Sequence, residues 1–245
     1  MTLPEVSSGP SREKVGEMFD RISHRYDLLN RLLSLRRDVA WRKLLCRYLP
    51  SGAELEILDL ACGTADVMLT LKERSQRVKT VVGLDLSRGM LSIGKGKIDH
   101  KGHSTNLAVV EGNAKDLPFP DRSFDAATIA FGIRNLAQLE TSLAEIRRVL
   151  RPKGRFIVLE FSLPANKLIR SLYLVYFRHI LPWLGGMISG DRSAYRYLDS
   201  TVETFPYGEE MVRILRAAGF ADVTRKPLTF GIATIYVADN TREAA

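Results

Sequence analysis

"LDLACGTADV", residues 58–67, is an apolar run interrupted by Asp59 that turns through small residues into the predicted start of a helix. A strand, a tight turn and a helix in this order form the first unit of an open α/β sheet, where ligands bind beyond the carboxyl ends of the strands. Small residues in the turn let a ligand approach the backbone, and the free N–H groups at the helix start can donate to an anionic group. The alternative is an ordinary tight turn that binds nothing.

The rest of the chain repeats this alternation. Strands are predicted near 55–60, 79–85, 106–111, 124–131 and 155–161, and two closing strands at 222–231 and 233–239 are near enough in sequence to pair antiparallel. The alternation with helices predicts an α/β fold with a doubly wound, mainly parallel seven-stranded sheet. We expect a flexible tail at 1–11 and a single domain at 12–245, with N-terminal helices at 12–50 and a helical insertion or lid at 164–205.

Positive charge is concentrated in two segments. The net charge is +8, of which residues 1–50 carry +4 (ten basic, six acidic) and residues 165–200 carry +3 (five basic, two acidic). Local positive charge can face nucleic acid, an anionic membrane or an acidic ligand, and it can also be an ordinary solvated surface.

The two cysteines, Cys46 and Cys62, form neither a disulfide framework nor a metal cluster, so we expect no metal. No apolar run reaches the roughly 20 residues of a membrane span, and the N-terminus lacks a signal peptide's apolar centre, which predicts a cytoplasmic protein.

A second aspartate ends the next strand, in "VVGLDLS" at residues 81–87. At this position the carboxylate of Asp85 can accept hydrogen bonds from both hydroxyls of a ribose. The G-x-G-x-x-G pattern of a dinucleotide site is absent, so we expect an adenosine ligand without a pyrophosphate, of which S-adenosylmethionine is the common one. After the third strand, Asn113 can supply an amide to an adenine edge and Ala114 a backbone N–H.

The chain also contains "GLDLS" (83–87), "GNAKDLPFPDRSFD" (112–125), "FGIRNL" (131–136) and "ISGDRSAYRYL" (188–198). With these stretches it resembles class I S-adenosylmethionine-dependent methyltransferases, and more narrowly the ubiquinone/menaquinone biosynthesis C-methyltransferases. The resemblance runs from about Val15 to near the C-terminus. It implies S-adenosylmethionine as cofactor, contacted by Thr64, Asp85, Asn113 and Ala114 in a pocket that Asp59 and Gly63 shape. Ala65 stands where these enzymes usually have glycine, and a left-handed backbone there would cost the alanine about 1 kcal/mol.

The resemblance implies methyl transfer to a ring carbon of a polyprenylated quinol, either demethylmenaquinol or a methoxy-polyprenyl-benzoquinol. The ring carbon becomes nucleophilic when a phenolic proton is lost, so the enzyme must align the reactants and stabilise the phenolate. We predict that Arg134, after the fourth strand, supplies this charge, the alternative being a structural ion pair. His24 is a candidate proton acceptor, although such a histidine is more often a packing or surface residue. Tyr195, with Asp191 nearby, is a candidate hydrogen-bond partner for the quinol.

A polyprenyl tail partitions into lipid, so the enzyme must take its substrate from a membrane or carrier surface, and the insertion at 164–205 could make this contact. "LIRSLYLVYFRHILPWLGGMI" (168–188) combines apolar and aromatic residues with Arg170 and Arg178, a composition suited to the headgroup region of a membrane. We therefore predict peripheral membrane binding, the alternatives being a buried core helix or a homodimer contact. A nucleic-acid methyltransferase is disfavoured because no Asn-Pro-Pro-Tyr-like tetrapeptide and no RNA-binding module is present. A non-catalytic scaffold that keeps the cofactor pocket is the third hypothesis.

Overall fold

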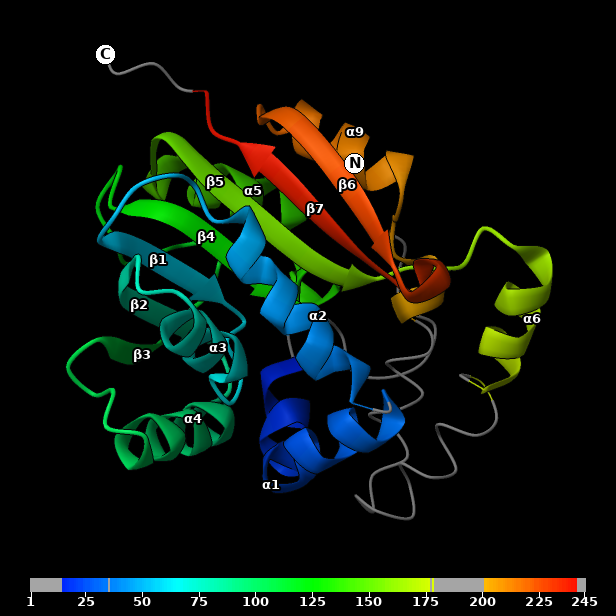
Figure 1. Cartoon of the computed structure of the whole chain (residues 1–245), viewed down its shortest axis with the longest axis horizontal. Helices are drawn as coiled ribbons and strands as arrows, with labels where there is room; N and C mark the ends of the chain where they lie inside the picture. Colours follow the sequence, from blue (N-terminus) through cyan, green and yellow to red (C-terminus); the bar gives the residue numbers. More distant parts are fainter. Residues whose placement is uncertain (1–14, 35, 177, 179–200, 242–245) are drawn as a thin grey trace.

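The structure is a computed structural model that describes residues 15–34, 36–176, 178 and 201–241. Its centre is a seven-stranded sheet (Figure 1). The strands are β1 Leu55–Leu60, β2 Val78–Asp85, β3 Leu107–Glu111, β4 Phe124–Ala130, β5 Leu150–Phe161, β6 Ala221–Leu228 and β7 Ala233–Asp239. Their order is β3-β2-β1-β4-β5-β7-β6 (Figure 1). Strands β1 to β5 run parallel, and β7 is antiparallel to both β5 and β6. This confirms the predicted mainly parallel sheet and the antiparallel pairing of the closing strands.

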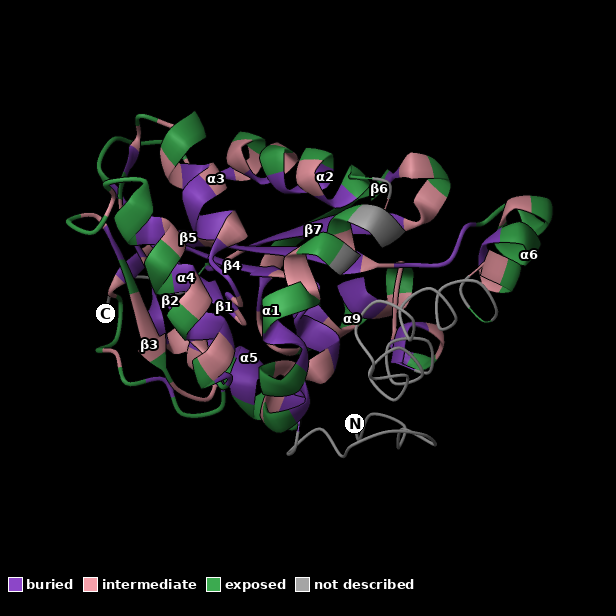
Figure 2. Ribbon diagram, turned by 90° about the horizontal axis from the view of Figure 1, so that it is seen from below, coloured by how far each residue is buried: buried purple, intermediate pink, exposed green. Residues whose placement is uncertain are grey.

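Helices cover both faces of the sheet, which explains why the central strands are apolar on both sides. One face carries α2 Arg37–Leu45, α3 Asp66–Arg74 and α4 Arg88–His100, and the other carries α5 Leu139–Val149 and α9 Glu209–Ala217. Figure 2 shows α2 and α3 on the opposite side of the sheet from α5 and α9. Successive residues of β1 serve the two cores, since Ile57 belongs to the cluster with Leu45 whereas Leu58 belongs to the cluster with Ile146. The sheet is thus fixed between two apolar layers, and its carboxyl edge is left to hold the site.

Strand β5 begins at Leu150, five residues before the predicted start. Leu150 pairs with Phe124 of β4, and the register shifts between Phe124 and Ala126 before regular pairing resumes at Arg155. Pairing with β4 thus extends the strand across this irregularity, which includes Pro152 and Gly154.

The N-terminal region is helical, as predicted. It consists of α1 Val15–Leu33, α2 and a short 3-10 turn at Cys46–Tyr48. Helix α1 packs on α4, and its residues Met18 and Ile22 share a buried cluster with Met90. Because α1 rests on α4 near the carboxyl edge of the sheet, it is placed to close a site at that edge (Figure 1).

Part of the predicted insertion is a helix, α6 Lys167–Val175, which begins after Asn166 caps the backbone N–H groups of Leu168 and Ile169. Residues 177 and 179–200 lie outside the described part of the chain. A 3-10 turn at Thr229–Gly231 joins β6 to β7. Among the described helices, none combines the length and the apolar content that crossing a bilayer requires.

Candidate active site

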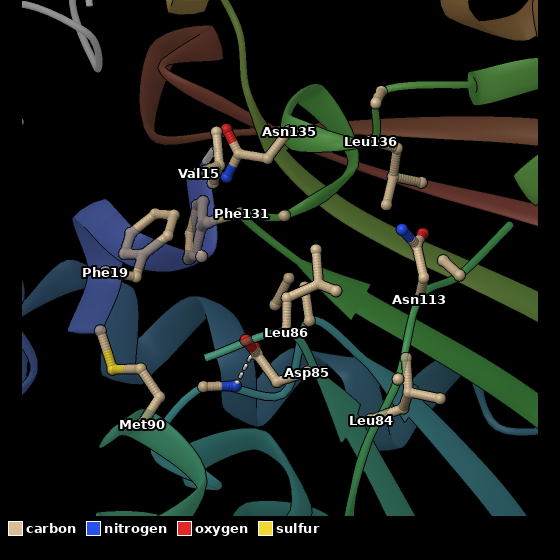
Figure 3. Close-up of a pocket in the computed structure, with 18 of the residues that line it drawn as sticks. Val15, Phe19, Leu84, Asp85, Leu86, Met90, Asn113, Phe131, Asn135 and Leu136 are labelled. Carbon is tan, nitrogen blue, oxygen red and sulfur yellow. Dashed lines mark hydrogen bonds between the residues drawn. The ribbon is translucent and has the colours of Figure 1, made fainter. Parts of the chain in front are cut away.

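A cavity of about 350 Å³ opens at the carboxyl ends of β1, β2, β3 and β4. Helix α1 forms one side of it through Val15 and Phe19, and Asn113 and Leu136 lie on the opposite side (Figure 3). Asp85 and Leu86, from the end of β2, lie between these two sides. The cavity therefore occupies the place where an open α/β sheet binds its ligand.

Asp85 brings a carboxylate to the cavity wall. Its Oδ2 accepts a hydrogen bond from the Gly63 backbone N–H at 2.8 Å (Figure 3), and its Oδ1 accepts one from the Ser87 N–H at 2.9 Å. Burial raises the pKa of Asp85, while these two N–H groups act to lower the pKa. A carboxylate has about four lone-pair sites. Asp85 can therefore accept hydroxyl groups of a ligand while it remains bonded to the turn.

The turn after β1 has the conformation that its small residues suggest. Gly63 lines the cavity with φ +53, and a Cβ placed on it would meet no atom within 4 Å, so a ligand can approach the backbone there. Ala65 has φ +65 and is fully buried. The predicted left-handed position is therefore present, and it carries an alanine.

Asn113 and Ala114 line the cavity beside Asp85, as the sequence predicts for cofactor contacts. Asn113 Oδ1 accepts a hydrogen bond from the Lys115 backbone N–H at 3.2 Å, which holds the side chain against its own loop. The loop also forms an isolated bridge between Asn113 and Asp116. An amide and a backbone segment are thus held at the end of β3, next to the carboxylate at the end of β2.

Thr64 is buried behind this turn, and it is not among the described residues that line the cavity. Its hydroxyl donates to Asp27 Oδ1 of α1 at 2.6 Å and accepts from Lys97 Nζ of α4 at 3.0 Å. Lys97 also forms ion pairs with Asp27 and with Asp66 at the start of α3. The cofactor contact predicted for Thr64 stays a prediction, whereas its observed contacts tie the turn to α1 and α4.

Asp59 lies under the turn, at 1% exposure, and does not line the cavity as the structure describes it. Its Oδ1 accepts a hydrogen bond from Thr128 Oγ1 at 2.6 Å, and its Oδ2 has no hydrogen-bond partner among the described residues. Burial raises the pKa of Asp59 to about 7, against the lowering effects of Thr128 and the charge on Arg42. Whether Asp59 shapes the pocket, as the resemblance implies, stays a prediction.

Arg134 lies in a 3-10 turn, Ile133–Asn135, directly after the cavity-lining residues Phe131 and Gly132. Its Nη1 donates to the Phe131 carbonyl and to Glu160 Oε1, both at 2.6 Å. Arg134 and Glu160 are both buried, and the ion pair that was the alternative to a catalytic role is present. Gly132 before the turn and Asn135 within it line the cavity, whereas the Arg134 side chain extends to Glu160 on β5.

Tyr26 of α1 lines the cavity, and His24 is exposed. The helical period explains the difference, since nine positions at about 100° per residue put His24 opposite Val15, whereas Phe19 and Tyr26 share the Val15 side. This spacing was the available signal for Tyr26, which lies on a helix that the resemblance places over the active site. The role predicted for His24 stays a prediction, and Tyr195 and Asp191 lie outside the described residues.

Comparison with known proteins identifies the family. Residues 8–240 match the model of the ubiE/COQ5 methyltransferase family. The chain belongs to this family. This methyltransferase is 48% identical over 222 residues to a demethylmenaquinone methyltransferase of Thermus thermophilus, covering 91% of this chain and 99% of that protein. It is 43% identical to the Deinococcus radiodurans protein of the same name, covering 93% and 92%. It is 39% identical to a Geobacter sulfurreducens protein named ubiquinone/menaquinone biosynthesis C-methyltransferase UbiE, covering 93% and 88%.

Solved structures confirm the fold of this methyltransferase. One match is a Thermotoga maritima methyltransferase described as S-adenosylmethionine-dependent and possibly a histamine N-methyltransferase, with a TM-score of 0.65 and 18% identity over 92% of this chain and 99% of that one. At this identity the match establishes the architecture alone. It confirms the Rossmann-like class I fold that the sequence predicts.

The cavity of this methyltransferase fits S-adenosylmethionine, the cofactor implied by the resemblance. The carboxylate of Asp85 suits ribose hydroxyls, and the amide of Asn113 suits a purine edge. Leu86 and Leu136 supply apolar surface for a ring, and the backbone at Gly63 is open to approach. These residues would hold the nucleoside, and no phosphate-binding glycine pattern competes with this assignment.

Proposed function

We propose that this methyltransferase transfers a methyl group from S-adenosylmethionine to a ring carbon of a polyprenylated quinol, converting demethylmenaquinol to menaquinol. The observation that carries the proposal is a cofactor-sized cavity with Asp85, Gly63 and Asn113 on adjacent strand ends. It occurs in a chain 48% and 43% identical to proteins named demethylmenaquinone methyltransferase. Bound S-adenosylmethionine supplies an electrophilic methyl group on a positively charged sulfur.

The electrostatic environment of the Tyr26 hydroxyl supports a phenolate-stabilising role for Arg134. The phenol of Tyr26 lines the cavity, and burial raises its pKa. A hydrogen bond with Asn30 and the charges of Arg42 and Arg134 act to lower the pKa of Tyr26, whereas Asp85 acts together with burial to raise it. A quinol hydroxyl in the same cavity would experience the same two positive charges. Arg134 therefore acts on the substrate oxygen electrostatically, from behind the cavity wall.

The substrate is tested by incubating the purified protein with labelled S-adenosylmethionine and a short-tailed demethylmenaquinol, kept reduced. A parallel sample contains the methoxy-benzoquinol, because one relative is named for both quinone pathways. We expect label in the naphthoquinone extract, and label in both extracts would extend the proposal to a dual-substrate enzyme. Label in neither extract, with cofactor binding verified by calorimetry, would overturn the proposal in favour of the scaffold hypothesis.

We also propose that the protein works at the cytoplasmic surface of a membrane through α6. Leu168, Leu172 and Val175 follow one another at helical spacing and are 71%, 64% and 51% exposed. Lys167 and Arg170 are exposed on the same helix, which suits an anionic surface. A lipid surface is the occupant that suits a substrate with a polyprenyl tail. The alternative of a homodimer contact is distinguished by the oligomeric state in solution without lipid.

A further inference from the structure

Glu160 and Arg134 form a buried ion pair at the carboxyl end of β5. The two side chains are 2% and 6% exposed, and Glu160 Oε1 also accepts the Phe161 backbone N–H at 2.8 Å. Glu160 Oε2 has no hydrogen-bond partner among the described residues. The Arg134 guanidinium lies 5.5 Å from the Phe161 ring centroid, and Phe161 packs on Phe131 of the cavity wall at 4.6 Å between centroids.

Stability alone does not explain this pair. Desolvating two charges commonly costs as much as their attraction returns, so a well-packed apolar pair would serve the core equally well. The uncompensated Oε2 adds to the cost, because a buried oxygen without a partner loses its hydrogen bond to water. Burial accordingly raises the pKa of Glu160, and the charge on Arg134 opposes the rise. A pair with this cost at the back of a cavity points to a role in the site.

The contacts specify that role. Arg134 Nη1 has two hydrogens, and they go to the Phe131 carbonyl and to Glu160 Oε1. The guanidinium is thereby fixed to both β5 and the cavity wall, where Phe131 holds a left-handed φ of +59. We propose that Glu160 is a positioning residue for methyl transfer, which holds the Arg134 guanidinium in place and offsets its charge toward the substrate oxygen. The inference rests on the proposed function.

In the described part of the chain, charged and titratable groups act on the pair from the turn after β4, from β7 and from α1. Arg134 itself lies in the turn after β4, Tyr236 on β7 is affected by the charge of Glu160, and Tyr26 on α1 is affected by the charge of Arg134. Neutralising Glu160 would leave the Arg134 charge without its offset, and a phenol in the cavity would then lose its proton at lower pH. An opposite charge within about 4–6 Å lowers an acid's pKa by about 1–3 pH units.

The test compares Glu160→Gln with Glu160→Asp in the full chain, using kcat for the demethylmenaquinol as a function of pH. Glu160→Gln keeps an oxygen acceptor and removes the charge, so we expect the midpoint of the acid limb to move down by about one pH unit, with KM for S-adenosylmethionine within about twofold. Glu160→Asp keeps the charge and shortens the reach, so we expect kcat to fall at least about tenfold with an unmoved midpoint.

Asp239→Asn is the matched control. Asp239 pairs with Arg155 at the other end of the same β5–β7 contact, with Arg155 Nε 2.6 Å from Asp239 Oδ1. We expect this control to lower thermal stability without moving the pH midpoint or kcat.

Wild-type pH profiles and kcat values in both Glu160 variants would overturn the inference and leave the proposed function standing. Should Glu160→Gln fail to fold, a wild-type kcat in Glu160→Asp would overturn it by itself. A wild-type protein that binds the cofactor and methylates neither quinol would instead overturn the proposed function, and the inference with it.

Discussion

Asp85 is the residue on which the cofactor assignment depends most directly. It ends strand β2, and its two oxygens already fix the turn at Gly63 and the start of α4 at Ser87. A single side chain therefore organises the loop and offers acceptors to the ligand. Burial raises the pKa of Asp85, and the N–H groups of Gly63 and Ser87 act against that rise.

Asp85→Ala should weaken S-adenosylmethionine binding at least about 100-fold, or about 2.7 kcal/mol, because hydrogen bonds to a charged group are lost and the turn loosens. Glu111→Ala is the matched control, since Glu111 stands beside Asp85 in the register of β2 and β3 and pairs with exposed Arg88. Titration calorimetry should give the control a wild-type dissociation constant. Equal affinities for the wild-type protein and the Asp85 variant would remove the ribose assignment.

Asp59 gives the protein a pH-dependent stability. Its pKa is about 7 in the fold and about 3.9 in the unfolded chain, so between these values the folded state binds one proton more. The stability that Asp59 contributes is therefore fully present below about pH 4 and is lost as the pH rises through about 7. Asp59→Asn removes this dependence.

The free energy of unfolding of Asp59→Asn, relative to wild type, should rise by about 2–3 kcal/mol between pH 5 and pH 8. Urea titrations of both proteins at four pH values in this interval measure the difference. Parallel pH dependences in the two proteins would mean that Asp59 is ionised throughout.

At the scale of elements, α1 closes the cavity and is held by carboxylates. Asp20 Oδ1 accepts hydrogen bonds from the Ser87 hydroxyl at 2.6 Å and the Gly89 N–H at 2.8 Å, at the N-terminus of α4, where a negative charge is favoured. Asp27 holds Thr64 and Lys97 further along the helix. Because α1 also supplies Tyr26 to the cavity wall, we expect the packing of α1 to affect cofactor binding.

Asp27→Ala should speed hydrogen exchange in α1 and lower the affinity for S-adenosylmethionine by about tenfold, equivalent to about 1.4 kcal/mol. Glu17→Ala is the control on the same helix, because the Glu17 side chain is exposed. Exchange measured by mass spectrometry with and without cofactor reports both effects. Faster exchange in α1 with unchanged affinity for S-adenosylmethionine would show that the packing of α1 does not affect cofactor binding.

At the scale of the whole molecule, α6 and its basic residues should determine membrane binding. Arg170→Glu should weaken binding to vesicles containing anionic phospholipid by about 30-fold at low salt, since each basic residue near such a surface contributes about 1 kcal/mol and charge reversal doubles the change to about 2 kcal/mol. Arg213→Glu on α9 is the control with the same change in net charge, and Arg213 is exposed beside Glu210. Co-sedimentation should leave the control unchanged. Equal losses in the two variants would indicate a general charge effect instead of docking through α6.

The sheet and the cavity residues Asp85 and Asn113 could be predicted from the sequence because both depend on local patterns. Strand ends, turn residues and the placement of Asp85 and Asn113 follow from alternation along the chain, and parallel strands then bring their carboxyl ends to one edge. Tyr26 was within reach of the same logic, since Phe19 and Tyr26 share one face of α1. His24, two residues away, is exposed for the same helical reason.

Taken alone, the sequence determined the α/β class, the order of strands and helices along the chain, the edge of the sheet at which the cavity opens, and the family. Only the tertiary structure decided the partners of its buried charges. Glu160 lies 26 residues from Arg134, and Asp27 lies 37 residues from Thr64. Such pairs follow from how strands and helices pack in space, and no local periodicity encodes them. A buried charge is stable only where the fold places an opposite charge beside it. The pairing of buried charged side chains could therefore be learned only from the tertiary structure.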